Sequence, residues 1–118
     1  MHDAVHALNR DAGEFVSLQL ESEASGSSLE VTKPQALVGR HSLADLRLPM
    51  PEISRRHCRL EFDNGLWRVV DLNSANGVFV NGERVQEACL HGGDRLQLGG
   101  ASFRVRFGAA PSAKRRAS

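Results

Sequence analysis

Cysteine is scarce in this sequence: it has two, Cys58 and Cys89, and neither belongs to a CxxC pair. Two isolated cysteines cannot build the framework of a disulfide-rich scaffold, and they lack the spacing of a zinc site. We therefore expect both to be reduced thiols in a reducing compartment. Cys58 lies at an inward position of an alternating pattern, and Cys89 is interpreted as a small buried hydrophobe.

Long apolar runs are also missing, since no stretch approaches the roughly 18 apolar residues of a membrane-spanning helix. The first residues, MHDAVHALNRDAGEF, lack the unbroken apolar core of a signal peptide. A cytoplasmic location is the default expectation, and no membrane partner is predicted.

A strong net charge is absent as well, because 15 Lys and Arg residues nearly balance 14 Asp and Glu residues. A formal charge of +1 creates no global field that would draw the chain onto nucleic acid. Aromatic residues make up 5% of the chain and do not alternate with the arginines, as a single-strand-binding surface would require. With 41% hydrophobic and 25% charged residues, the 118-residue chain has the profile of one globular domain.

What the sequence has instead is a hydrophobic period of two. In FRVRF, the residues Phe103, Val105 and Phe107 alternate with arginines, which predicts one buried and one solvated strand face. Similar alternation runs through residues 15–20, 28–33 and 57–62, and Trp67 alternates with Val69 as a core residue would. The sequence favours no helix of three turns beyond the N-terminus.

Turn signals separate these segments at short intervals. The DNG at residues 63–65 predicts a tight hairpin, because Asn and Gly tolerate the positive φ that such a turn requires. The pattern gives about ten strands, which indicates an all-β sandwich of two antiparallel sheets. We expect a flexible N-terminal extension at residues 1–13, a domain at 14–108 and a flexible basic C-terminal tail at 109–118.

Three loops carry unusual polar residues: Gly39 to His41, Ser54 to His57, and Asn73 to Gly77. Two guanidiniums and a hydroxyl, from Arg40, Arg55 and Ser54, would suit a phosphate dianion because arginine presents forked donors and keeps its charge. The amide of Asn76 both donates and accepts, which suits a peptide main chain.

The residues of these loops do not favour catalysis or metal binding. None of them offers a nucleophile–base pair, so we predict no enzymatic activity, no cofactor and no small-molecule substrate. His2 and His6 have a helical i, i+4 spacing that suits a metal, but two histidines alone do not make a site, and no metal site is predicted.

The motifs occur in a characteristic order. Gly39-Arg40, Ser54-Arg55-Arg56-His57, Asn76-Gly77 and Asn81-Gly82 together resemble the forkhead-associated (FHA) domain over about residues 15–107. Within this span, DLNSANGVFVNGERV is similar to the family's Asp-Leu-x-Ser-x-Asn-Gly segment.

The resemblance implies a SMAD/FHA-type sandwich of about 11 strands that binds phosphothreonine peptides. Carried over by position, Arg40, Ser54 and Arg55 would contact the phosphate, and Asn76 would bind the peptide main chain. The residues with a structural role would be Gly39, His57, Gly77, Asn81 and Gly82.

One position departs from the family pattern. Ala75 stands where the family often has a threonine that lines the phosphothreonine pocket, which weakens the expected affinity but not the binding mode. Ser74 and Ala75 are assigned to the pocket or its rim, although Ser74 is expected to face elsewhere. Arg56, adjacent to Arg55 but on the opposite side of the chain, is either a surface charge or a rim contact.

The predicted function is that of a phosphothreonine-dependent adaptor in Ser/Thr kinase signalling, with a kinase or its substrate as partner. Phosphate-independent protein association through a sheet face or edge is an alternative, and it predicts binding that survives Arg40→Ala. A weaker alternative, which competition with free phosphothreonine peptide would distinguish, is nucleic-acid binding through Arg40, Arg47, Arg55, Arg56 and Arg59.

Overall fold

The computed structural model describes residues 15–108, and the predictions for residues 1–13 and 109–118, with His2 and His6, lie outside this range. Residues 15–108 form strands, turns and loops without a helix, and thus contain no helix long and apolar enough to span a membrane. The eleven strands are β1 (Leu18–Ser22), β2 (Ser28–Val31), β3 (Gln35–Gly39), β4 (Leu46–Arg47), β5 (Cys58–Asp63), β6 (Leu66–Asp71), β7 (Val78–Val80), β8 (Glu83–Val85), β9 (Glu87–Leu90), β10 (Arg95–Leu98) and β11 (Ala101–Phe107).

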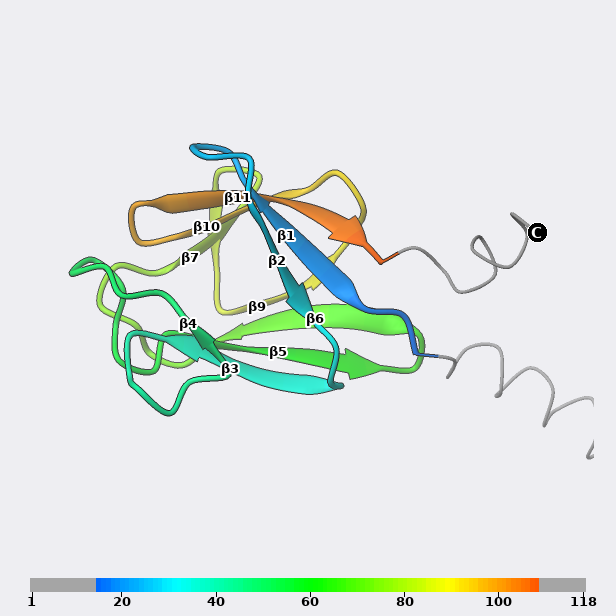
Figure 1. Ribbon diagram of the computed structural model, residues 1–118, viewed down its shortest axis with the longest axis horizontal. Coiled ribbons are helices and arrows are strands. Elements are labelled where there is room, and N and C mark those ends of the chain that lie inside the picture. The colour runs from blue at the N-terminus through cyan, green and yellow to red at the C-terminus, as the bar shows by residue number, and fades with distance from the viewer. Residues whose placement is uncertain (1–14, 109–118) are drawn as a thin grey trace, which may run out of the picture.

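The strands form two layers (Figure 1). One sheet has six strands in the order β2-β1-β11-β10-β7-β8, and the other has five in the order β4-β3-β5-β6-β9. The predicted all-β sandwich is confirmed, as is the strand number that the family resemblance implied. One pairing departs from the prediction, because the short β4 runs parallel to β3 while every other pair is antiparallel.

The core lies between the sheets, where alternate residues of each strand point inward. Trp67 is 1% exposed, as its alternation predicted, and its indole N–H donates to the Val16 carbonyl at 2.8 Å. Cys58 is fully buried, and this burial raises the pKa of its thiol far above the usual range.

Two residues predicted to be buried are exposed. Cys89 lies on the outer face of β9, opposite Arg68, because its neighbour Leu90 takes the inward position and successive side chains alternate. Phe107 is 40% exposed, whereas Phe103 and Val105 are buried, because Phe107 is the last residue of β11 and lies at the end of the sandwich.

Two Asn-Gly pairs close hairpins. Asn64 and Gly65 have φ values of 52° and 79° between β5 and β6, and Asn81 and Gly82 have 51° and 86° between β7 and β8. Positive φ at both central residues is the geometry of a two-residue hairpin turn with the twist of its strands. The Asn64–Gly65 hairpin is thus confirmed.

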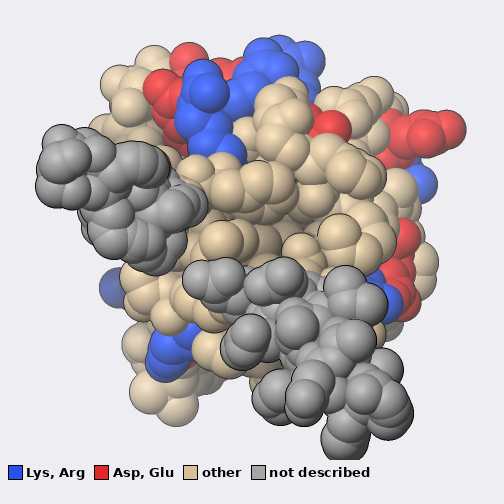
Figure 2. Space-filling model, turned by 90° about the vertical axis from the view of Figure 1, so that its right-hand side faces the viewer, with Lys and Arg blue, Asp and Glu red and all other residues tan. Residues whose placement is uncertain are grey.

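The two ends of the sandwich differ. The loops β3–β4, β4–β5 and β6–β7 gather at one end, on the left of Figure 1, while β1 begins and β11 ends at the other. Figure 2 looks onto this second end, where the visible centre is uncharged and the charged side chains lie toward the margins. The polar loops singled out by the sequence therefore share the first end.

Candidate functional site

The first loop after β3 lies directly against the loop that precedes β5. The backbone N–H of Arg40 donates to the Ser54 carbonyl at 3.0 Å, and that of His41 donates to the Arg55 carbonyl at 3.1 Å. A Cβ on Gly39 would come within 2.1 Å of the Arg55 carbonyl oxygen. Only glycine permits this approach, which brings together the two loops that carry the predicted phosphate ligands.

The predicted ligands Arg40, Ser54 and Arg55 thus lie together at the loop end. Arg40 is exposed, yet its Nε donates to the Ile53 carbonyl at 2.9 Å. This bond orients the guanidinium and leaves both terminal nitrogens available for a ligand. Arg55 is exposed beside it, and neither arginine has a carboxylate partner among residues 15–108.

The hydroxyl of Ser54 also joins the third loop. Its Oγ accepts a hydrogen bond from the Ala75 N–H at 2.9 Å. A hydroxyl that accepts one bond retains its own hydrogen, which it can donate to an anion. Ser54 therefore has the geometry to connect two loops and to bind a ligand at the same time.

His57 holds the loops together from beneath. Its side chain is fully buried, and Nδ1 accepts a hydrogen bond from the Ser54 N–H at 3.0 Å. Because Nδ1 is the acceptor, Nε2 carries the proton and donates to the Gly77 carbonyl at 2.9 Å. The ring therefore links the β4–β5 loop to the β6–β7 loop as a structural element.

The β6–β7 loop is braced by its own side chains. The Ser74 N–H donates to Asp71 Oδ1 at 3.0 Å, and the Ser74 hydroxyl accepts from the Gly77 N–H at 3.0 Å. Ser74 is 6% exposed, so it lies beneath the loop. This corrects its assignment to the pocket or rim and agrees with the expectation that it faces elsewhere. Asp71 belongs to the quoted Asp-Leu-x-Ser segment, but only the fold shows that its carboxylate caps this loop.

Asn76 lies at the exposed tip of the same loop. Its Nδ2 donates to the Glu52 carbonyl at 2.7 Å, which leaves Oδ1 and the second N–H available. Ala75 is exposed next to it, and Arg56 is exposed on the β4–β5 loop. Sequence reasoning missed Glu52, since a backbone carbonyl contact leaves no signal in the residue type.

Of two further residues, Asn81 faces away from the loop end and Arg84 lies against it. Asn81 bonds away from the loops, with Nδ2 on Asp94 and Oδ1 on the Arg95 N–H, so it ties the β7–β8 hairpin to the β9–β10 turn. Arg84, which the sequence did not single out, lies with its guanidinium against Gly77. Within residues 15–108, no group of three or more His, Cys, Asp or Glu side chains is placed to hold a metal ion.

Comparison with known proteins places this geometry in a family. The family model of the FHA domain matches residues 36–99. Among curated relatives, the chain is 39% identical over 96 residues to FhaA of Mycobacterium tuberculosis, covering 81% of this chain and 18% of FhaA. It is 34% identical over 110 residues to the oxoglutarate dehydrogenase inhibitor of Corynebacterium efficiens, covering 93% of this chain and 76% of that protein. It also matches the glycogen accumulation regulator GarA of Mycolicibacterium smegmatis at 39% over 83 residues, covering 70% of this chain and 51% of GarA.

Solved structures agree. A domain from a structural and functional analysis of phosphothreonine-dependent FHA domain interactions superposes with a TM-score of 0.70 at 37% identity, covering 80% of this chain and 98% of that one. The FhaA FHA domain, solved in complex with the intracellular domain of Rv3910, gives 0.68 at 38% identity, covering 78% of this chain and 100% of that one. With a family model that matches more than half of its residues and relatives above 30% identity, this chain belongs to the FHA domain family.

Proposed function

We propose that this chain binds phosphothreonine peptides through Arg40, Ser54 and Arg55, as a non-catalytic adaptor in Ser/Thr kinase signalling. The observation that carries the proposal is the backbone contact between the β3–β4 and β4–β5 loops, which places Arg40 beside Ser54 and Arg55. Within residues 15–108, neither arginine pairs with a carboxylate. Two arginines and a hydroxyl on adjoining loops offer forked donors with permanent charge, and a phosphate dianion can accept hydrogen bonds from them.

Asn76 has the complementary role in this proposal. Because one of its N–H groups is bonded to the Glu52 carbonyl, its side chain is already oriented before a ligand arrives. Its free Oδ1 and second N–H match the donor and acceptor of one peptide unit. A peptide would therefore be held at the phosphate by Arg40, Ser54 and Arg55 and at its main chain by Asn76.

The names of the relatives support a regulatory binding function. Their names describe an inhibitor and a regulator, and a neighbour of similar fold was studied for phosphothreonine-dependent interactions. We infer that the partner is a phosphothreonine-containing protein, either a Ser/Thr kinase or a kinase substrate, met in the cytoplasm. Nucleic acid, membrane and small-molecule substrates are not part of this proposal.

The test is a degenerate phosphothreonine peptide library, presented beside unphosphorylated and phosphoserine versions. The unmutated chain should retain phosphothreonine peptides, and Arg40→Ala should abolish their retention. Arg106→Ala is the matched control, because Arg106 is an exposed arginine that pairs with Glu21 on the outer face of the six-stranded sheet. Its retention of the library should equal that of the unmutated chain.

Other outcomes identify the alternatives. Protein partners captured equally well with Arg40→Ala would favour phosphate-independent association through a sheet face or edge. Nucleic acid that binds and is not displaced by free phosphothreonine peptide would favour the arginines as a nucleic-acid surface. Either result, without phosphothreonine retention, would reject the proposal.

A further inference from the structure

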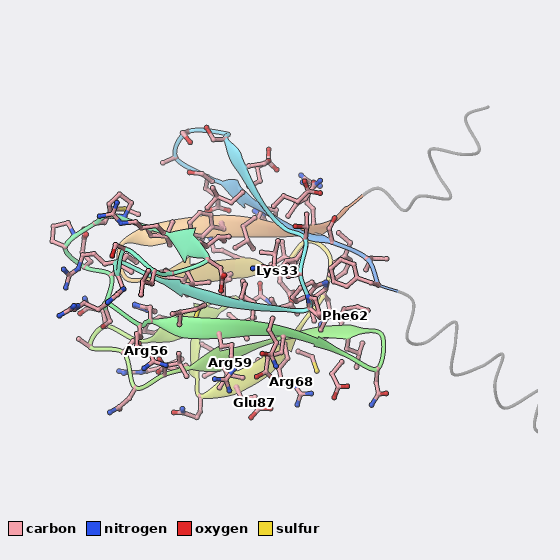
Figure 3. All side chains as sticks on the ribbon, turned by 60° about the horizontal axis from the view of Figure 1, so that its bottom comes forward. Lys33, Arg56, Arg59, Phe62, Arg68 and Glu87 are labelled. Carbon is pink, nitrogen blue, oxygen red and sulfur yellow. The ribbon has the colours of Figure 1, made fainter. Side chains whose placement is uncertain are left out.

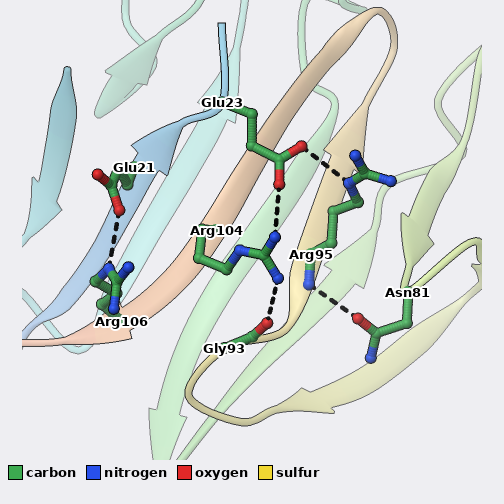
Figure 4. A network of polar contacts seen from close by, with 7 residues as sticks. All are labelled: Glu21, Glu23, Asn81, Gly93, Arg95, Arg104 and Arg106. Carbon is green, nitrogen blue, oxygen red and sulfur yellow. Dashed lines mark hydrogen bonds and ion pairs between the residues drawn. The ribbon is translucent and has the colours of Figure 1, made fainter. Parts of the chain in front are cut away.

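The arginines of this domain fall into two groups. Residues 15–108 contain ten arginines, and five of them pair with carboxylates on the outer faces of the sheets: Arg59, Arg68, Arg95, Arg104 and Arg106. Figure 4 shows this pairing on the six-stranded sheet, where Glu23 bridges Arg95 and Arg104 while Glu21 binds Arg106. Figure 3 shows Arg59, Arg68 and Glu87 on the outer face of the five-stranded sheet.

The remaining five arginines, Arg40, Arg47, Arg55, Arg56 and Arg84, have no carboxylate partner among residues 15–108. All of them border the loop end. Figure 3 shows Arg56 there. Arg47 lies beside Arg40, because its Nε donates to the Arg40 carbonyl at 3.4 Å. Uncompensated positive charge is therefore concentrated around the proposed peptide site, although the whole chain is nearly neutral.

Arg84 is the member of this group with the most specific position. A Cβ built on Gly77 would lie 2.8 Å from its Nε, 3.0 Å from Cζ and 3.2 Å from Nη2. Three guanidinium atoms at similar distances mean that the planar group lies across the glycine, and that the missing side chain makes room for it. Arg84 extends from β8, while Gly77 follows Asn76 in the β6–β7 loop.

The acidic residues nearby do not neutralise Arg84. Glu83 precedes it on β8, so the two side chains point to opposite sides of the strand. Glu52 directs its carboxylate toward the β10–β11 turn, where Oε2 would be 3.0 Å from a Cβ on Gly100. The guanidinium of Arg84 therefore remains available to a ligand beside the residue proposed to hold the peptide main chain.

We propose that Arg84 selects phosphothreonine peptides that carry an aspartate or glutamate close to the phosphothreonine. This inference rests on the proposed function, because Arg84 would read a peptide that Arg40, Ser54, Arg55 and Asn76 hold in place. A guanidinium presents a fork of donors that fits a carboxylate with two parallel hydrogen bonds. The partner class is thus an acidic segment around a phosphorylated threonine.

The experiment compares pairs of phosphothreonine peptides that differ by one aspartate or asparagine, moved through each flanking position, by fluorescence anisotropy. For the unmutated chain, we expect aspartate to strengthen binding about two- to fivefold at one or two positions, the range of an exposed ion pair. Arg84→Gln should weaken the binding of the aspartate peptides more than that of the asparagine peptides, and so remove this preference. Arg84→Lys should retain part of it, since the charge remains but the fork is lost.

Arg106→Gln is the matched control for loss of one positive charge, and it should keep the full preference. The inference is overturned if Arg84→Gln keeps the preference, or if it weakens aspartate and asparagine peptides equally. It is also overturned if the unmutated chain binds phosphothreonine peptides without any acidic preference, while the proposed function stands. Failure to bind any phosphothreonine peptide would reject both, so the two failures are distinguishable.

Discussion

Ser54 is the residue at which the three loops of the site meet. Its carbonyl accepts from the Arg40 N–H, its N–H donates to His57, and its hydroxyl accepts from the Ala75 N–H. The sequence predicted Ser54 only as a phosphate ligand. Because the same residue also positions Arg40 and Ala75, its scaffold role and its proposed binding role cannot be separated by removing it.

His57 provides a cleaner test of the scaffold. His57→Ala would leave the Ser54 N–H and the Gly77 carbonyl without their partner and create a cavity beneath the loops. We expect the free energy of unfolding to fall by about 3 kcal/mol or more, measured by urea denaturation. The exposed His91, replaced by alanine, should change it by less than about 0.5 kcal/mol. Equal losses in the two variants would contradict a structural role for His57.

Ala75 is the residue where affinity can be gained. It is exposed beside Ser54 and Asn76, at the position where the family often has threonine. A new hydroxyl bond to a charged phosphate contributes about 1.5–3 kcal/mol at most, and less in a solvated site. We therefore expect Ala75→Thr to strengthen phosphothreonine peptide binding several-fold by calorimetry. Ala75→Val adds the same shape without the hydroxyl and should not strengthen this binding. An equal gain in affinity for Ala75→Val would indicate that packing, and not the hydroxyl bond, is responsible.

At the scale of elements, the contact between the β3–β4 and β4–β5 loops depends on Gly39. Gly39→Ala would place a methyl group 2.1 Å from the Arg55 carbonyl oxygen, so the loops must separate. We expect a loss of about 2–3 kcal/mol in stability, together with loss of phosphopeptide binding. Gly82→Ala is the matched control, because its added Cβ meets nothing within 4 Å and only the φ of +86° is strained. Gly82→Ala should lower the stability by about 1 kcal/mol and leave phosphopeptide binding intact. A larger loss of stability in Gly82→Ala than in Gly39→Ala would contradict the close approach of the two loops.

A carboxylate binds one of the backbone N–H groups on the exposed edge of β3. Asp45 Oδ2 accepts from the Leu37 N–H at 2.7 Å, where the two-residue β4 does not reach, and its other oxygen meets Lys33. The bond to Leu37 is the main reason that the pKa of Asp45 is lowered. Edge N–H groups invite pairing with another chain, and this carboxylate occupies one of them.

The pH dependence of stability follows from this lowered pKa. Since the folded pKa lies below the unfolded one, the contribution is present above about pH 4 and is lost as the pH falls through the folded value. Asp45→Asn should therefore flatten the fall in urea stability between about pH 5 and pH 3. Some acid sensitivity should remain from Asp94, where burial raises the pKa but hydrogen bonds from Asn81 and His91 lower it further. Identical pH profiles for the two proteins would contradict the role of Asp45.

At the scale of the whole molecule, the charge is nearly balanced but unevenly distributed. Within residues 15–108, paired arginines cover the sheet faces, while the unpaired ones surround the loop end. Their field acts on a ligand only at short range in physiological salt, because it is screened within about 8 Å.

Ligand charge should therefore control binding. The second pKa of a phosphothreonine is about 6, so affinity should decrease as the pH drops from 7 to 5 and the dianion becomes a monoanion. Higher salt should weaken binding as well, and less so for Arg40→Ala if any binding remains. Anisotropy titrations across pH and salt would measure both effects. Affinity that is constant between pH 5 and pH 8 would contradict a site selective for the dianion.

The sequence by itself determined the class of fold and pointed to the residues proposed as ligands. A two-residue hydrophobic period and Asn-Gly turns depend on local geometry, so they predicted the sandwich and its hairpins before any contact was known. The sequence could likewise identify the motifs that contain Arg40, Ser54, Arg55 and Asn76, because each motif is contiguous in the chain.

The tertiary structure alone decided which residues are buried or exposed and which distant segments lie in contact. It placed Ser74 beneath its loop, turned Cys89 outward, paired β4 in parallel with β3, and laid Arg84 across Gly77. Each of these facts depends on a partner distant in the chain or on which of two strand faces is covered. Local residue patterns carry no record of such contacts, because burial and pairing arise only when the two sheets pack together.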